Sequence, residues 1–111
     1  LVQLPNDYIQ FLRLTDGLNW NGVELFSIHP HERHDTVFGQ LTLMEYQQNN
    51  PIQSRYPKSI IIGMAHEEWI IYVGSEHEYR IVDRSTLEPI VRLPRLADVL
   101  YFYWDSFSNA S

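Results

Sequence analysis

The stretch LPNDYIQFLRLTDGLNWNG, residues 4–22, decides the fold, because it predicts a helix with marked ends that runs directly into a turn. Pro5 suits the first turn of a helix, where its missing N–H group costs nothing. Asp16-Gly17 ends the helix, since glycine adopts the left-handed conformation without a steric penalty. Asn21-Gly22 then turns the chain a second time. The stretch therefore predicts a helix that ends at residue 16 and a strand that begins at about residue 22.

The predicted helix has one apolar face. Asn6 or Asp7 can accept hydrogen bonds from the free backbone N–H groups of its first turn. Four residues at the spacing i, i+3, i+4 and i+7 form the expected buried stripe: Tyr8, Phe11, Leu12 and Thr15. This helix should pack against a larger apolar surface, which the rest of the chain has to supply.

The remaining chain alternates between strand-like and helix-like segments. Residues 22–28 alternate in polarity and predict a strand, residues 29–35 form a polar loop broken by proline, and residues 36–49 predict a second helix. Four further strand-like runs follow, joined by short turns: 59–62, 68–73, 77–83 and 89–93. The glycines at 39, 63 and 74 are isolated and indicate turns or helix irregularities.

Pro94 opens a final helix with its own apolar stripe, formed by Leu96, Val99, Leu100, Tyr103 and Phe107. The element order predicts an α+β fold, with helices packed on a single antiparallel or mixed sheet of about five strands. We expect one domain over residues 1–104 and a polar C-terminal tail over residues 105–111.

Composition excludes several classes of function. The chain has 111 residues, no cysteine and a net charge of −6, and its eight Lys and Arg residues are scattered. Nucleic acid is therefore not an expected partner, since binding a polyanion requires concentrated positive charge. Disulfides, thiolate zinc sites and cysteine nucleophiles are excluded. No apolar run approaches the roughly 20 residues of a membrane span, so we expect no membrane association.

Residues that could carry out catalysis do not form a convincing set. His29, His31 and His34 could approach a metal ion, but no further ligand is placed beside them, and a polar solvated loop is the simpler interpretation. Glu67 and Glu68 are adjacent at a strand start and point to opposite faces. The common nucleophile and phosphate-binding motifs are missing. We expect no enzyme activity, no metal and no cofactor.

Aromatic residues at exposed-looking positions are the remaining candidates for function. Trp20 lies between two turns, Trp69 follows two glutamates at a strand start, and Tyr101 and Trp104 lie off the main stripe of the last helix. Trp and Tyr supply much contact area with few rotatable bonds and are common in protein interfaces. The alternative is that the domain buries them under its own loops.

The pattern LPxxYxxFLxxxDGLxxNGxELF over residues 4–26 resembles the signature of the SUKH superfamily, the Smi/Knr-like group. The resemblance extends over nearly the whole chain, through residues 60–63, 69–72, 79–83 and 96–100. Residues 64–68 differ from the acidic or Asp-Gly turn common in the family, and the helix that usually precedes the motif is absent, which suggests an N-terminally trimmed chain.

The resemblance implies an α+β domain without catalysis. Many bacterial members of the family are immunity proteins that neutralise a toxin domain, and others are regulatory interaction modules, as in fungal cell-wall regulators. Our first hypothesis is a cytoplasmic immunity protein whose partner is a basic toxin domain, such as a nuclease. Four carboxylates would steer the encounter (Glu67, Glu68, Glu76 and Glu78), and the four aromatic candidates would supply contact area. The alternative is a housekeeping regulatory or scaffold module.

Overall fold

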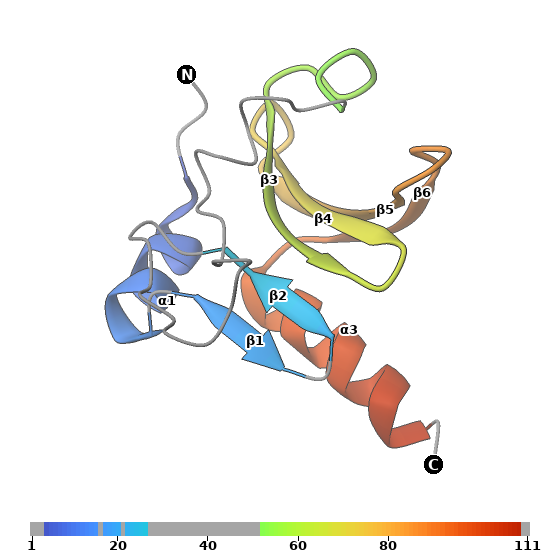
Figure 1. Ribbon diagram of the computed structural model, residues 1–111. Helices are drawn as coiled ribbons and strands as arrows, with labels where there is room; N and C mark the ends of the chain where they lie inside the picture. Colours follow the sequence, from blue (N-terminus) through green and yellow to red (C-terminus); the bar gives the residue numbers. More distant parts are fainter. Residues whose placement is uncertain (1–3, 16, 21, 27–51, 110–111) are drawn as a thin grey trace, which may run out of the picture.

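The described residues form one six-stranded antiparallel sheet with two helices, as Figure 1 shows. The computed structural model describes residues 4–15, 17–20, 22–26 and 52–109. Its elements are α1 Asn6–Thr15, β1 Leu18–Trp20, β2 Val23–Leu25, β3 Ser59–Ala65, β4 Glu68–Val73, β5 Glu78–Asp83, β6 Pro89–Leu93 and α3 Leu96–Asn109. The α+β prediction is confirmed. The helix expected over residues 36–49 lies outside the described residues.

The sheet is a meander in which each strand pairs with the next one in the chain, in the order β1 to β6. The sequence did not predict β1, which we interpreted as part of a turn. Leu18 pairs with Leu25 and Trp20 with Val23, and a two-residue connection joins the strands, with Gly22 at a φ of +83°. Three residues are too few for an alternating pattern, which is why this strand was missed.

Both helices pack on the same face of the sheet. Glu68 and Tyr72 are four residues apart on β4 and therefore point to one face, and Tyr72 pairs with Tyr79 of β5. The Tyr79 hydroxyl donates to Asp7 Oδ1 of α1 at 2.6 Å, and the Tyr103 hydroxyl of α3 donates to Glu68 Oε1 at 2.9 Å. Within the described part of the chain, neither helix is long and apolar enough to cross a membrane.

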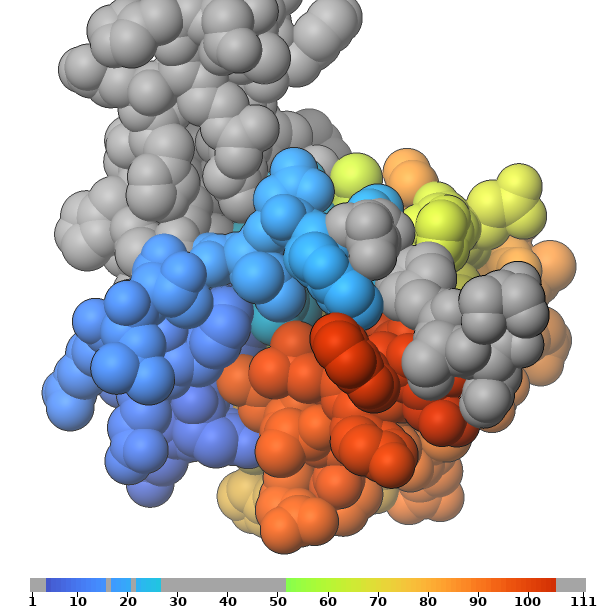
Figure 2. Space-filling model, turned by 90° about the horizontal axis from the view of Figure 1, so that it is seen from below, coloured from blue at the N-terminus to red at the C-terminus, as the bar shows by residue number. Residues whose placement is uncertain are grey.

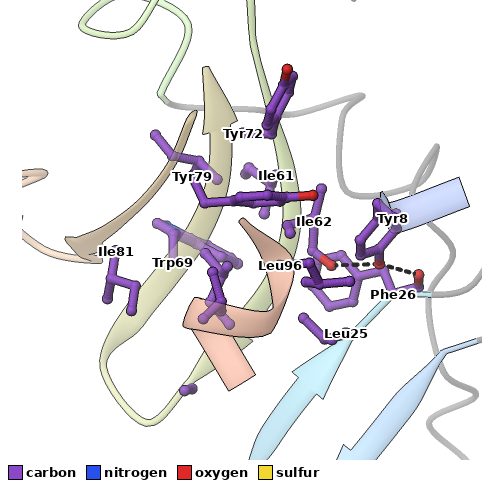
Figure 3. Close-up of a cluster of buried hydrophobic side chains, with 14 of the residues drawn as sticks. Tyr8, Leu25, Phe26, Ile61, Ile62, Trp69, Tyr72, Tyr79, Ile81 and Leu96 are labelled. Carbon is purple, nitrogen blue, oxygen red and sulfur yellow. Dashed lines mark hydrogen bonds between the residues drawn. The ribbon is translucent and has the colours of Figure 1, made fainter. Parts of the chain in front are cut away.

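The core forms between α1, α3 and the central strands (Figure 3). Tyr8 is fully buried, and its hydroxyl lies 2.6 Å from the Phe26 carbonyl oxygen and 3.1 Å from that of Ile62. The stripe predicted for α1 is confirmed at Tyr8 and Leu12, whereas Thr15 is exposed. In α3 the predicted core positions Leu96, Val99 and Tyr103 are buried. The side chain of Phe107 lies outside those described.

Gly63 was expected in a turn or at a helix irregularity, and the structure places it inside β3. A Cβ atom at this position would lie 2.3 Å from the backbone oxygen of Glu24 and 2.9 Å from Leu25 Cδ2. Only a residue without a side chain therefore allows β2 to approach β3 this closely. Gly63 thus fixes where the β1–β2 hairpin, which carries Trp20, joins the sheet.

Candidate functional site

One end of the sheet brings together residues from β1, β4 and α3. Cross-strand pairing places Trp20 opposite Val23, Val23 opposite Ala65, and Ala65 opposite Glu68. Trp20 and Glu68 therefore lie in one row across four strands, at the end where β1 connects to β2 and β3 connects to β4. We call this the first end of the sheet. The second half of α3 passes the same end, where Tyr103 contacts Glu68.

Two tryptophans from distant parts of the sequence stack at the first end. The Trp20 and Trp104 rings have centroids 5.5 Å apart and an interplanar angle of 14°. Trp104 is 59% exposed, and Trp20 is half-buried. Figure 2 shows the second half of α3 lying against β1 and β2 on this side of the molecule.

Tyr101 extends this aromatic area along α3. It lies three residues before Trp104, so the two side chains are neighbours on the helix surface. Tyr101 is 68% exposed. We call Trp20, Tyr101 and Trp104 the aromatic surface. Three of the four aromatic candidates from the sequence therefore form one continuous area.

Trp69, the fourth aromatic candidate, does not belong to this surface. Only 9% of Trp69 is exposed, and the Arg84 guanidinium lies 4.5 Å from its ring centroid. Strand alternation puts Trp69 on the face opposite Glu68, so it points away from α3. The expectation that Trp69 lies at the surface is wrong, because β4 is buried on both faces over residues 69–73.

The two glutamates before Trp69 have different environments. Glu68 is half-buried and accepts the hydrogen bond from Tyr103, whose pKa is raised by burial. Glu67 lies exposed in the β3–β4 turn, where its backbone oxygen accepts a hydrogen bond from the Arg84 N–H at 2.8 Å. Glu68 therefore holds α3 on β4, and the Glu67 carboxylate adds negative charge at the first end.

Glu76 and Glu78 lie at the opposite, second end of the sheet, in and after the β4–β5 turn. Glu78 accepts hydrogen bonds from Arg80 Nε at 3.0 Å and from Arg92 Nε at 2.6 Å. Glu76 pairs with the same two arginines. The bond from Arg92 is the main reason that the pKa of Glu78 is lowered to about 2. The structure thus separates these two carboxylates from the aromatic surface and engages both in ion pairs.

Asp7 has a role that the sequence did not reveal. We expected it to cap its own helix, but Asp7 Oδ2 accepts a hydrogen bond from the backbone N–H of Leu96 at 2.8 Å and therefore caps α3. Its other carboxylate oxygen accepts from Tyr79, which is 1% exposed and whose pKa is raised by burial. One side chain on α1 thus joins both helices and β5. No local pattern could show this, because all three partners are distant in sequence.

The residues available for metal chemistry give no site. His29, His31 and His34 lie outside the described residues, and within the described ranges no group of three or more His, Cys, Asp and Glu residues could hold a metal ion. Comparisons with known protein families, curated proteins and solved structures return no match to this chain. A function for the chain therefore has to be inferred from its surface chemistry and its motif.

Proposed function

We propose that this chain is a non-catalytic domain that binds another protein through the aromatic surface of Trp20, Tyr101 and Trp104. The observation that carries the proposal is the stacking of Trp20 on Trp104 while Trp104 and Tyr101 stay 59% and 68% exposed. Large aromatic side chains stabilise a complex by removing much apolar area from water. The other exposed large apolar residues in the described ranges, Leu14 and Ile90, lie singly on α1 and β6.

The edges of the sheet are less suited to binding than the aromatic surface. β6 begins with Pro89 and has a register shift opposite Ile81 and Val82. Proline and bulges are common devices that prevent another strand from adding to an edge. β1, at the other edge, has only three residues. These features favour contact through side chains over strand addition.

The kind of partner is suggested by the charge and by the motif of residues 4–26. The resemblance to the SUKH superfamily supports an immunity protein that acts in the cytoplasm on a toxin domain, and the net charge of −6 suits a basic partner, such as a nuclease. Glu67 lies exposed at the first end of the sheet and would attract a basic partner. Glu76 and Glu78 are not part of this proposal, since Arg80 and Arg92 already balance their charge.

The proposal is tested by capturing partners from the source cells with three forms of the chain: wild type, the double variant Tyr101→Ala/Trp104→Ala, and Ile90→Ala. Ile90→Ala is the matched control, because it removes an exposed apolar side chain at the opposite edge of the sheet. We expect the wild type and the control to retain one partner that the double variant loses. Equal retention by all three forms would contradict the proposal.

Co-expression then tests the immunity role. If the captured partner is a toxin, wild-type chain should restore the growth of cells that express it, and the double variant should not. A captured partner that is harmless to cells would instead identify a regulatory or scaffold module of the Smi/Knr type, and the immunity role would be wrong.

A further inference from the structure

We infer that the partner places an arginine or lysine side chain against the aromatic surface, where α3 supplies the negative charge. This inference rests on the proposed function and specifies the chemistry of the contact. Three features of the described residues support this inference. They are the charge pattern of α3, the partial negative charge at the C-terminal end of this helix, and the exposed aromatic rings.

The charge pattern of α3 is one-sided. The helix contains two aspartates, Asp98 and Asp105, and no lysine or arginine. Asp98 lies three residues before Tyr101, and Asp105 lies four residues after it, so both carboxylates share the helix face of Tyr101. Asp98 is paired with Arg95, just before the helix, and Asp105 is exposed one turn after Tyr101. α3 therefore carries acidic side chains and no basic ones on the face of Tyr101.

The C-terminal end of α3 adds to this negative potential. The last carbonyl groups of a helix carry about half a negative charge, which a lysine or arginine in the last turn commonly offsets. The last turn of α3 has no basic residue. A cation contributed by a partner at this end would interact favourably with the helix and with Asp105.

The aromatic rings themselves attract a cation. The face of an indole or phenol ring is negative, and Trp binds a guanidinium or ammonium group more strongly than other aromatic residues do. The chain uses this contact internally, where Arg84 lies over Trp69 and the Arg80 guanidinium lies 5.7 Å from the Tyr56 ring centroid. At the aromatic surface, exposed rings and a neighbouring carboxylate favour a cationic side chain over an anionic or purely apolar one.

The test uses the side-chain N–H signals of the three tryptophans in a ¹⁵N NMR titration of the chain with a tetra-arginine peptide. Trp69 is buried and serves as an internal reference. We expect saturable shifts of the Trp20 and Trp104 signals, weakened by added salt, and little change at Trp69. Tetra-glutamate, an oligothymidylate and cellotetraose should give no comparable shifts.

Two charge variants test whether Asp105 contributes to the binding of tetra-arginine. Asp105→Asn should weaken tetra-arginine binding by about threefold to tenfold, since it removes a charge next to the bound cation. Glu88→Gln is the matched control, because it removes the same charge from an exposed position in the β5–β6 connection, and it should leave the affinity unchanged. Equal affinities for Asp105→Asn and wild type, or shifts caused by the oligothymidylate or the sugar and not by tetra-arginine, would overturn the inference.

Competition separates this inference from the proposed function. If a captured partner requires Trp104 but tetra-arginine does not displace it, the partner binds without a cation at this surface and the inference is wrong, while the proposed function stands. If tetra-arginine binds as expected and no form of the chain captures a protein, the cation site stands and the proposed function is wrong.

Discussion

The two ends of the sheet use polar and aromatic side chains in opposite ways. At the second end, the side chains of Asp7, Tyr79 and Glu78 contact other parts of the same chain, through hydrogen bonds of 2.6–3.0 Å. At the first end, Tyr101 and Trp104 remain more than half exposed. The difference shows that large aromatic side chains stay in contact with water at the first end, which is where we propose that a partner binds.

Two adjacent residues of α3 show the same contrast at close range. Tyr103 is 4% exposed and donates its hydroxyl proton to Glu68, whereas Trp104 is 59% exposed and stacks on Trp20. A position in the sequence next to a buried residue therefore says little about function. Exposure and internal bonding decide which side chain can contact a partner.

The largest effect is expected from Gly63→Ala, which should lower the stability of the fold and also disturb the aromatic surface. The new methyl group would overlap the backbone of Glu24 and push the β1–β2 hairpin away from β3. We expect the free energy of unfolding to fall by about 3 kcal/mol or more, as measured by urea denaturation. Gly74→Ala, in the β4–β5 turn, is the control and should cost less than about 1 kcal/mol. Similar losses for both variants would contradict the role given to Gly63.

Asp7→Ala should lower stability by about 1–3 kcal/mol, because it removes the cap of α3 and leaves the buried Tyr79 hydroxyl without its acceptor. Tyr79→Phe keeps the cap and should cost less. Gln10→Ala, an exposed change on the same helix, should stay within about 0.5 kcal/mol of wild type. Urea denaturation checks all three, and an Asp7→Ala variant as stable as Gln10→Ala would show that Asp7 does not join the helices.

Tyr103→Phe should cost about 0.5–1.5 kcal/mol, since the substitution deletes only the hydrogen bond to Glu68. Tyr101→Phe, which removes an exposed hydroxyl two residues earlier, should leave the free energy of unfolding nearly unchanged. Partner affinity should not change with Tyr103→Phe. A loss of affinity without a loss of stability would show that Tyr103 itself contacts the partner.

The smallest effect concerns Glu78 and depends on pH. Its pKa is lowered from 4.5 to about 2, so the unfolded chain binds more protons than the folded chain between these pH values. The stabilisation from Glu78 is therefore complete above pH 4.5 and is lost as the pH falls toward 2. In urea denaturation at a series of pH values, Glu78→Gln should be less stable than wild type at neutral pH, and the difference should shrink over that range. A stability difference between Glu78→Gln and wild type that does not change with pH would contradict the lowered pKa of Glu78.

Most of the fold could be predicted because its elements are long enough to show a pattern. The strand-like run of residues 68–73, the alternation in residues 77–83, and the apolar stripes of the two described helices correspond to observed strands and core positions. β1 was missed because three residues carry no pattern. Gly63 was misassigned, because the close approach of β2 that requires it is a contact between distant segments.

The candidate site was only partly predictable, for the same reason. The sequence indicated that Trp20, Tyr101 and Trp104 lie outside the regular core stripes, which agrees with the exposure of Tyr101 and Trp104 and with the half-buried position of Trp20. It could not show that Trp20 stacks on Trp104, nor that Arg84 covers Trp69. The carboxylates at 68, 76 and 78 were expected to steer an encounter with another protein, but each contacts a side chain of this chain that strand pairing or α3 brings to it.

The most direct test of the binding surface is the dissociation constant of the captured partner for Trp104→Ala, measured by calorimetry beside its urea unfolding curve. We expect the affinity to fall at least about 30-fold, a loss of about 2 kcal/mol, because a central aromatic contact is removed. The free energy of unfolding should change by less than about 1 kcal/mol, since Trp104 is 59% exposed. An unchanged affinity would contradict the account, as would an affinity loss fully matched by a loss of stability.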